Sequence, residues 1–186
     1  SALSLEAWSS GQVWAYPRQQ YLLNEHVIAA TANAVVNWAR ADTSRPVLAC
    51  GIAFKGVPRT DDTRHSVGLK IVEALTRHRI DARVYDLGVP ASAIQALGMI
   101  PADLPIDLAA YSAILLLNND PGYVGVLQSA LPPGAAGTVG LYDPWRLILS
   151  DEASVFAGAM PFAKLSEQLR VRLHMEESPV VIGRAA

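Results

Sequence analysis

Charged side chains gather in one segment of the chain, GIAFKGVPRTDDTRHS, which separates an apolar run from an amphipathic one. Its cations and neighbouring acids are Lys55, Arg59, Arg64, Asp61 and Asp62. A lysine ammonium is a compact charge that suits a phosphate group, and the free backbone amides that open a helix also favour anions. We therefore expect a nucleotide or a nucleotide sugar to bind at this segment. The alternative is a solvated loop whose charges pair with one another.

The two acids of this segment also have a structural explanation. An oxygen at the start of a helix accepts hydrogen bonds from amides that have no partner within the helix. We expect Asp61, Asp62 or Thr63 to cap the helix that follows, and we favour capping over catalysis for both acids. Arg64 has a comparable alternative, an ion pair with one of them.

Short apolar runs alternate with helix-like segments along most of the chain. The expected strands are 45–54, 80–88, 111–119, 137–143 and 179–183, and the expected helices are 66–79, 89–99, 121–131 and 161–173. Strands that are apolar throughout belong to a parallel sheet covered on both faces, and right-handed crossovers make such a sheet doubly wound and Rossmann-like. Ligands of these sheets bind beyond the carboxyl ends of the strands, where the charged segment leaves the first strand.

A long helix precedes this alternation. Residues 20–40 are rich in alanine and contain neither glycine nor proline, which is typical of a helix. The predicted organisation is an irregular N-terminal arm (1–19), a helical segment (20–44) and a Rossmann-like domain (45–186).

Composition narrows the class of protein further. Of 186 residues 51% are hydrophobic and 17% are charged, and the net charge of −2 argues against a nucleic-acid partner bound by bulk charge. No apolar run reaches the roughly 18 residues that span a bilayer, so we expect no membrane segment. With no export signal visible and only one cysteine, Cys50, we expect a cytoplasmic protein. The four histidines show no zinc spacing.

The motif G-x-A-F-K at 51–55, followed by T-D-D-x-R at 60–64, a helix and a strand that ends Tyr85-Asp86, resembles a known family. It is similar to the C-terminal, nucleotide-sugar-binding domain of the UDP-glucose/GDP-mannose dehydrogenase family. The helix 24–39 resembles the central helix that precedes that domain, and the resemblance extends over roughly residues 20–186.

The resemblance implies an activity for a complete enzyme. These enzymes use NAD to oxidise the C6 alcohol of a nucleotide sugar to a carboxylate, in two hydride transfers through a cysteine-bound intermediate. Such sugars supply polysaccharide biosynthesis. The chain lacks both a G-x-G-x-x-G turn and the catalytic-cysteine motif, and Cys50 lies in an expected buried strand. We therefore expect no catalytic residue here, and no oxidation without a separate NAD-binding half.

The resemblance also implies site residues. Phe54 and Lys55 would bind the UDP- or GDP-linked sugar, Arg64 would reach toward NAD, and Arg146 would contact the substrate. Arg146 follows Asp143 by three positions, whereas the family has two. Trp145 could stack on a base, although we favour a packing role.

Two further expectations concern the oligomeric state and an alternative function. The apolar face of the helix 20–40 predicts a homodimer. A function of a different class is a non-catalytic binding or assembly module that kept the fold, because the chain departs from the family motif at Arg146 and at His65.

Overall fold

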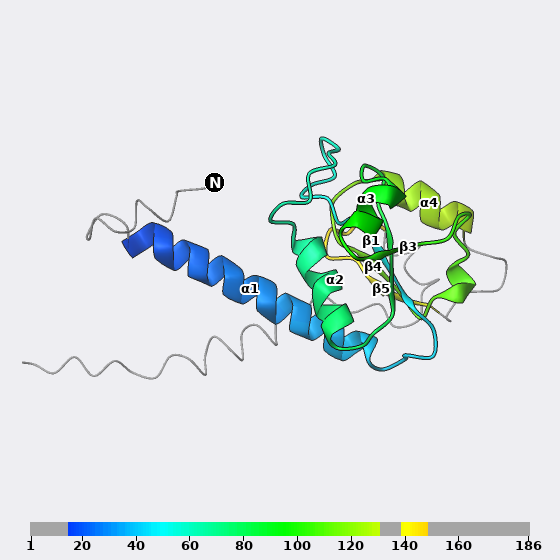
Figure 1. Cartoon of the computed structure of the whole chain (residues 1–186), viewed down its shortest axis with the longest axis horizontal. Coiled ribbons are helices and arrows are strands. Elements are labelled where there is room, and N and C mark those ends of the chain that lie inside the picture. Colours follow the sequence, from blue (N-terminus) through cyan, green and yellow to red (C-terminus); the bar gives the residue numbers. More distant parts are fainter. Residues whose placement is uncertain (1–14, 131–138, 149–186) are drawn as a thin grey trace, which may run out of the picture.

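A five-stranded parallel sheet forms the centre of the protein in a computed structural model that describes residues 15–130 and 139–148 (Figure 1). The strands are β1 (Val47–Cys50), β2 (Ala82–Tyr85), β3 (Ile100–Pro101), β4 (Ala113–Leu116) and β5 (Gly140–Tyr142). The helices are α1 (Ala15–Ala39), α2 (Val67–Arg77), α3 (Ala91–Ala96) and α4 (Gly122–Ala130), with a short 3-10 turn, η2 (Leu108–Ala110). The predicted helix 161–173 and strand 179–183 lie outside the described residues.

The strand order β3-β2-β1-β4-β5 confirms the predicted Rossmann-like architecture. β1 is central and pairs in parallel with two neighbours, so that Val47 lies opposite both Ala82 and Ala113. All neighbouring pairs are parallel, and each crossover carries a helix or a loop from one strand end back to the start of the next.

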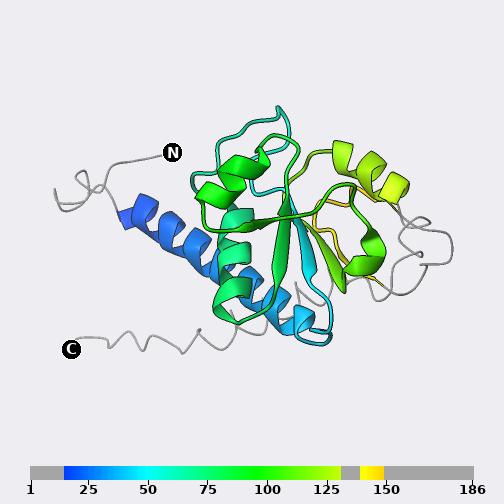
Figure 2. The ribbon, with the colours of Figure 1, turned by 45° about the vertical axis from the view of Figure 1, so that its right-hand side comes forward.

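The two faces of the sheet bury two separate apolar clusters, because successive side chains of a strand point to opposite sides. Val47 and Ala49 of β1 face a cluster that includes α1 and α2. Leu48 and Cys50 face the other cluster, to which α4 contributes Tyr123 and Leu127. Helices therefore cover both faces, as Figure 2 shows, and this double cover explains why the strands are apolar throughout.

Helix α1 is packed over only part of its length. Its C-terminal half buries six apolar side chains, Ile28, Ala32, Ala34, Val35, Val36 and Ala39. Its N-terminal half extends beyond the sheet (Figure 1) and exposes Tyr21, Leu22, Leu23 and Val27. Glu25 and Lys70 form an ion pair of 2.7 Å that links α1 to α2.

One predicted boundary was wrong, and one short strand was not predicted. Helix α1 begins at Ala15, so the last five residues of the predicted arm 1–19 are helical. Pro17 fits there, because the amides of a first helical turn have no partner within the helix. The sequence also gave no indication of β3, which has only two residues; its Pro101 is tolerated because β3 is an edge strand.

Candidate functional site

The charged segment leaves the sheet at its topological switch point. The loop 51–66 carries the chain from β1 to α2 on one face, and the neighbouring turn 117–121 carries it from β4 to α4 on the other face. Where neighbouring connections leave a parallel sheet toward opposite faces, they leave a crevice beyond the carboxyl ends of the strands, and α/β sheets bind ligands there. The structure therefore places the predicted binding segment where the fold favours a site.

The carboxylate of Asp86, at the end of β2, fixes the start of this loop. Its Oδ2 accepts a hydrogen bond of 2.9 Å from the Ala53 amide, and its Oδ1 accepts bonds of 2.7 and 3.0 Å from the amides of Gly88 and Val89. The loop is also closed on itself, because the Phe54 amide donates to the Asp62 carbonyl at 2.7 Å. Residues 54–62 thus form a loop whose two ends are joined.

The middle of the loop lies against the β4–α4 turn. The Gly56 amide donates to Asn119 Oδ1 at 2.9 Å. A Cβ atom at Gly56 would collide with the backbone of Asp120, and one at Gly51, where φ is +95°, would lie 2.6 Å from Asn118 Cγ. Glycine is required at both positions because the two backbones approach closely.

A forked ion pair joins the loop to the same turn. Arg59 Nε lies 2.6 Å from Asp120 Oδ2, and Arg59 Nη2 lies 3.1 Å from Asp120 Oδ1. The Asp120 side chain is only 5% exposed, whereas that of Arg59 is 51% exposed. The Arg59 guanidinium, and next the Gly122 amide, lower the pKa of Asp120, and the pKa of Arg59 is raised in turn.

Asp62, the second acid of the T-D-D-x-R motif, forms an ion pair with Arg64, the residue predicted to reach toward the cofactor. Arg64 Nε and Nη2 donate to the two Asp62 carboxylate oxygens at 2.9 and 2.8 Å, and these bonds lower the pKa of Asp62. This confirms the alternative explanation of Arg64 as an ion-pair partner. The capping prediction was wrong, because Ser66 is the N-cap of α2 and its Oγ accepts from the Leu69 amide at 3.3 Å.

Phe54 and Lys55, the predicted substrate residues, are exposed in the first part of the closed loop 54–62. Phe54 is 58% exposed, and its aromatic ring contributes no buried packing to the core. Lys55 is also exposed, and no described side chain forms an ion pair or a hydrogen bond with its ammonium. Of the two acids of the loop, Asp62 is engaged by Arg64, and Asp61 forms no ion pair with Lys55. Lys55 therefore keeps its charge available for a ligand.

The third predicted substrate residue, Arg146, follows β5, and so it lies at the carboxyl ends of the strands, as the loop 51–66 does. One strand, β4, separates β5 from β1. Arg146 is exposed and has a φ of 54°, in a turn where Asp143 Oδ2 accepts from the Ile148 amide at 2.9 Å. Trp145 is 50% exposed, which argues against the packing role that we favoured.

Beneath the loop, the reactive side chains are buried and inert. Cys50 is fully buried, and loss of solvation raises the pKa of its thiol, as expected for a core residue. Tyr123 is also fully buried; its hydroxyl accepts from the Leu87 amide at 3.3 Å, and burial raises its pKa. Neither group is a nucleophile in this structure.

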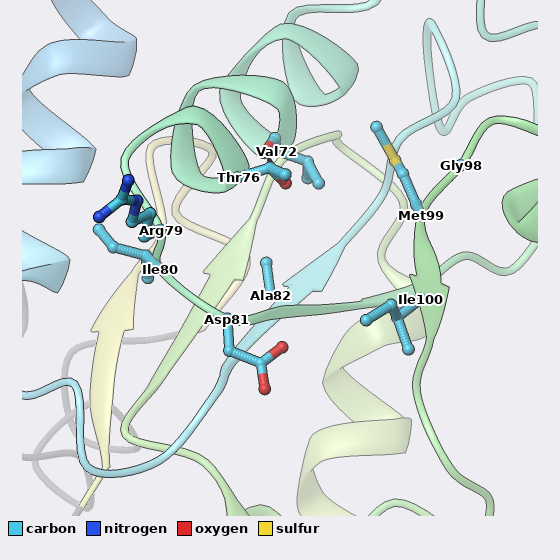
Figure 3. Close-up of a pocket in the computed structure, with 9 residues that line it drawn as sticks. All are labelled: Val72, Thr76, Arg79, Ile80, Asp81, Ala82, Gly98, Met99 and Ile100. Carbon is cyan, nitrogen blue, oxygen red and sulfur yellow. Dashed lines mark hydrogen bonds between the residues drawn. The ribbon is translucent and has the colours of Figure 1, made fainter.

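A cavity of about 290 Å³ lies near the amino ends of β2 and β3, at the other end of the strands from the loop 51–66 (Figure 3). It is bounded by α2 and by the residues that precede β2 and β3, and Val72 and Thr76 of α2 lie across it from Met99 and Ile100. Because it borders the amino ends of the strands, it is remote from the loop 51–66.

Sequence reasoning missed the contacts that hold the loop. Asp120 had no recognisable partner in the sequence, because it lies 61 positions after Arg59 and only the fold brings the two together. The N-N-D-P-G run at 118–122 is typical of a turn before a helix, and an acidic residue at the end of a buried strand is a signal for anchoring such as that of Asp86.

The described residues contain neither a membrane-spanning helix nor a metal-binding cluster. Within 15–130 and 139–148, no helix is both long enough and apolar enough to cross a membrane. The same residues contain no group of three or more histidine, cysteine or acidic side chains that could hold a metal ion.

Comparison with known proteins supports the interpretation of the loop. A search of curated proteins found no match to the chain. Residues 48–131 match the model of the UDP-glucose/GDP-mannose dehydrogenase family, UDP binding domain. This segment begins in β1 and contains the loop 51–66, α2, the β4–α4 turn and α4. The predicted resemblance to this family is thereby confirmed for residues 48–131.

Proposed function

We propose that this chain binds the diphosphate of a nucleotide sugar at the carboxyl edge of its sheet, as part of a nucleotide-sugar 6-dehydrogenase. The observation that carries the proposal is an exposed lysine, Lys55, without a partner among the described side chains, on a loop that is fixed by hydrogen bonds. An unpaired ammonium attracts a diphosphate, and a loop that is already ordered loses little conformational freedom on binding.

Neighbouring side chains supply the rest of the proposed site. Phe54 presents an exposed ring, and Trp145 presents a second one beyond β5, so either ring could cover the base or the sugar. Arg146 adds a cation at the same edge. Arg64 is assigned to the cofactor side, where its Nη1 group, which the Asp62 pair does not use, would remain available to donate.

NAD does not fit this chain as its own cofactor. The β1–α2 connection lacks the G-x-G-x-x-G turn, and its backbone is engaged by Asp86 and Asn119 rather than open toward a pyrophosphate. Hydride transfer from the sugar C6 carbon is therefore assigned to a separate NAD-binding half, and no catalytic residue to this segment. The proposed setting is polysaccharide biosynthesis in the cytoplasm.

Titration calorimetry with UDP, UDP-glucose and GDP tests this proposal, together with an absorbance assay for reduced NAD. We expect UDP and UDP-glucose to bind and the chain alone to reduce no NAD. Absence of binding for all three nucleotides at millimolar concentration would favour the non-catalytic module instead. Turnover by the chain alone would contradict the assignment of hydride transfer to another half.

The exposed part of α1 supports the proposal of a homodimer. Tyr21, Leu22, Leu23 and Val27 are 40–53% exposed on a helix that extends beyond the sheet (Figure 1). Apolar side chains grouped in this way are typical of an interface. Light scattering after size exclusion should give a dimer for the wild type and a monomer for the Leu22→Glu/Leu23→Glu variant. A wild-type monomer would contradict the proposal.

A further inference from the structure

The stretch 54–59 of the β1–α2 loop has no apolar anchor of its own. Between positions 54 and 59 every residue except Gly56 is exposed, and Phe54 and Val57 expose 58% and 57% of their surfaces. Hydrophobic burial therefore does not hold this stretch in place, and its conformation depends on polar contacts.

Two of those contacts reach the β4–α4 turn. One is the Gly56 amide bond to Asn119, and the other is the forked pair of Arg59 with Asp120. The pair has the parallel two-bond geometry that makes arginine–carboxylate contacts strong and directional. Of the two contacts, the ion pair is the charged one and therefore the stronger.

Asp120 is also held by hydrogen bonds within the β4–α4 turn, independently of Arg59. Its amide donates to Asn118 Oδ1 at 3.2 Å, and its Oδ1 accepts from the Gly122 amide at 2.8 Å, where α4 begins. A nearly buried carboxylate held in this way is a rigid point of attachment. The position of Arg59 is thereby defined relative to the sheet, and Lys55 lies four residues before it.

We propose that Arg59 and Asp120 are positioning residues that hold the loop in the conformation in which Lys55 meets a diphosphate; this role rests on the proposed function. We assign Arg59 to the loop rather than to the ligand, because Asp120 engages its Nε and Nη2 donors; a ligand contact through the remaining Nη1 group is the outcome that the double variant below distinguishes. Without the pair, the stretch around Gly56 would sample other conformations, and only a fraction of molecules would present Lys55 correctly.

The test combines UDP titration with amide exchange. The variants are Arg59→Met, Arg59→Lys, Asp120→Asn, Lys55→Met and the double variant Lys55→Met/Arg59→Met. Asp120→Asn keeps an oxygen for the Gly122 amide and removes the charge, so it tests the pair even if Arg59→Met is poorly folded through its unpaired carboxylate. Thermal unfolding of each variant establishes that it is folded.

We expect Arg59→Met and Asp120→Asn to weaken UDP binding about tenfold and Arg59→Lys to restore part of the loss. The double variant should bind no more weakly than Lys55→Met, because Arg59 acts through Lys55. In the ligand-free protein, exchange of the Gly56 amide should be at least tenfold faster in Arg59→Met. A role in stability alone would not produce this dependence on Lys55.

Three results would overturn the inference. Additive effects of the two substitutions would show that Arg59 contacts the ligand itself. Unchanged Gly56 exchange in Arg59→Met would show that the pair does not order the loop. Normal UDP binding by both Arg59→Met and Asp120→Asn would remove the positioning role and leave the proposed function intact, whereas a wild type that binds no UDP would remove both.

Discussion

Replacement of Gly56 by alanine tests whether the β1–α2 loop lies against the β4–α4 turn. The added Cβ would collide with the Asp120 backbone amide and lie 2.5 Å from Asp120 Cβ. Overpacking of this kind costs about 1–3 kcal/mol, and loss of the Gly56–Asn119 hydrogen bond costs about 1 kcal/mol more. We therefore expect the free energy of unfolding to fall by about 2–4 kcal/mol.

Urea denaturation measures this effect, and Gly125 offers a matched control. With a slope of about 2 kcal/mol per M, the midpoint of Gly56→Ala should fall by about 1–2 M. Gly125 lies in α4 with open space where its Cβ would be, so Gly125→Ala should instead stabilise the protein by about 0.5–1 kcal/mol. Gly56→Ala within about 0.5 kcal/mol of the wild type would refute the close contact of loop and turn.

Three other predictions follow from single groups. The pKa of Asp120 is lower in the folded protein than in the unfolded protein, where it is about 3.9, so the ionised carboxylate stabilises the fold above that pH. The difference in unfolding free energy between wild type and Asp120→Asn should therefore shrink as the pH falls below about 4. A difference that does not depend on pH would contradict this. The fully buried Cys50 thiol should react with a thiol reagent only at the rate of unfolding; fast labelling of the native protein would show that it is accessible. At His65, where φ is 59°, valine should destabilise the protein by about 1–2 kcal/mol relative to glycine in thermal or urea unfolding, and equal stabilities would argue against a left-handed backbone there.

The architecture could be predicted from the sequence because buried strands and helices leave recognisable patterns of apolar residues. β1 and β4 are buried at every position, and a continuous apolar run is what a sheet covered on both faces requires. The start of α1 and the short edge strand β3 were missed for the opposite reason. Pro17 disguises the first turn of a helix, and two residues are too few to show a period.

The place in the fold of the segment that carries the candidate site was predictable from the sequence, but its internal contacts were not. The motif placed Phe54, Lys55 and Arg64 in the loop after the first strand, and the structure has them there. The partners of this loop come from other strand ends, so no local pattern could reveal that Asp120 pairs with Arg59. Capping was assigned to the wrong residue because Asp62 is held by Arg64, which leaves Ser66 at the helix start.

The central claim is that the ammonium of Lys55 binds the diphosphate of a nucleotide. The most direct measurement is the dissociation constant of UDP by titration calorimetry for wild type, Lys55→Met and Arg77→Met. The Arg77 variant removes the same charge from the last turn of α2, away from the carboxyl edge. A charged hydrogen bond is worth about 1.5–3 kcal/mol, so Lys55→Met should weaken binding at least about tenfold while Arg77→Met leaves it nearly unchanged. Equal affinities of the two variants, or no UDP binding by the wild type, would contradict the account.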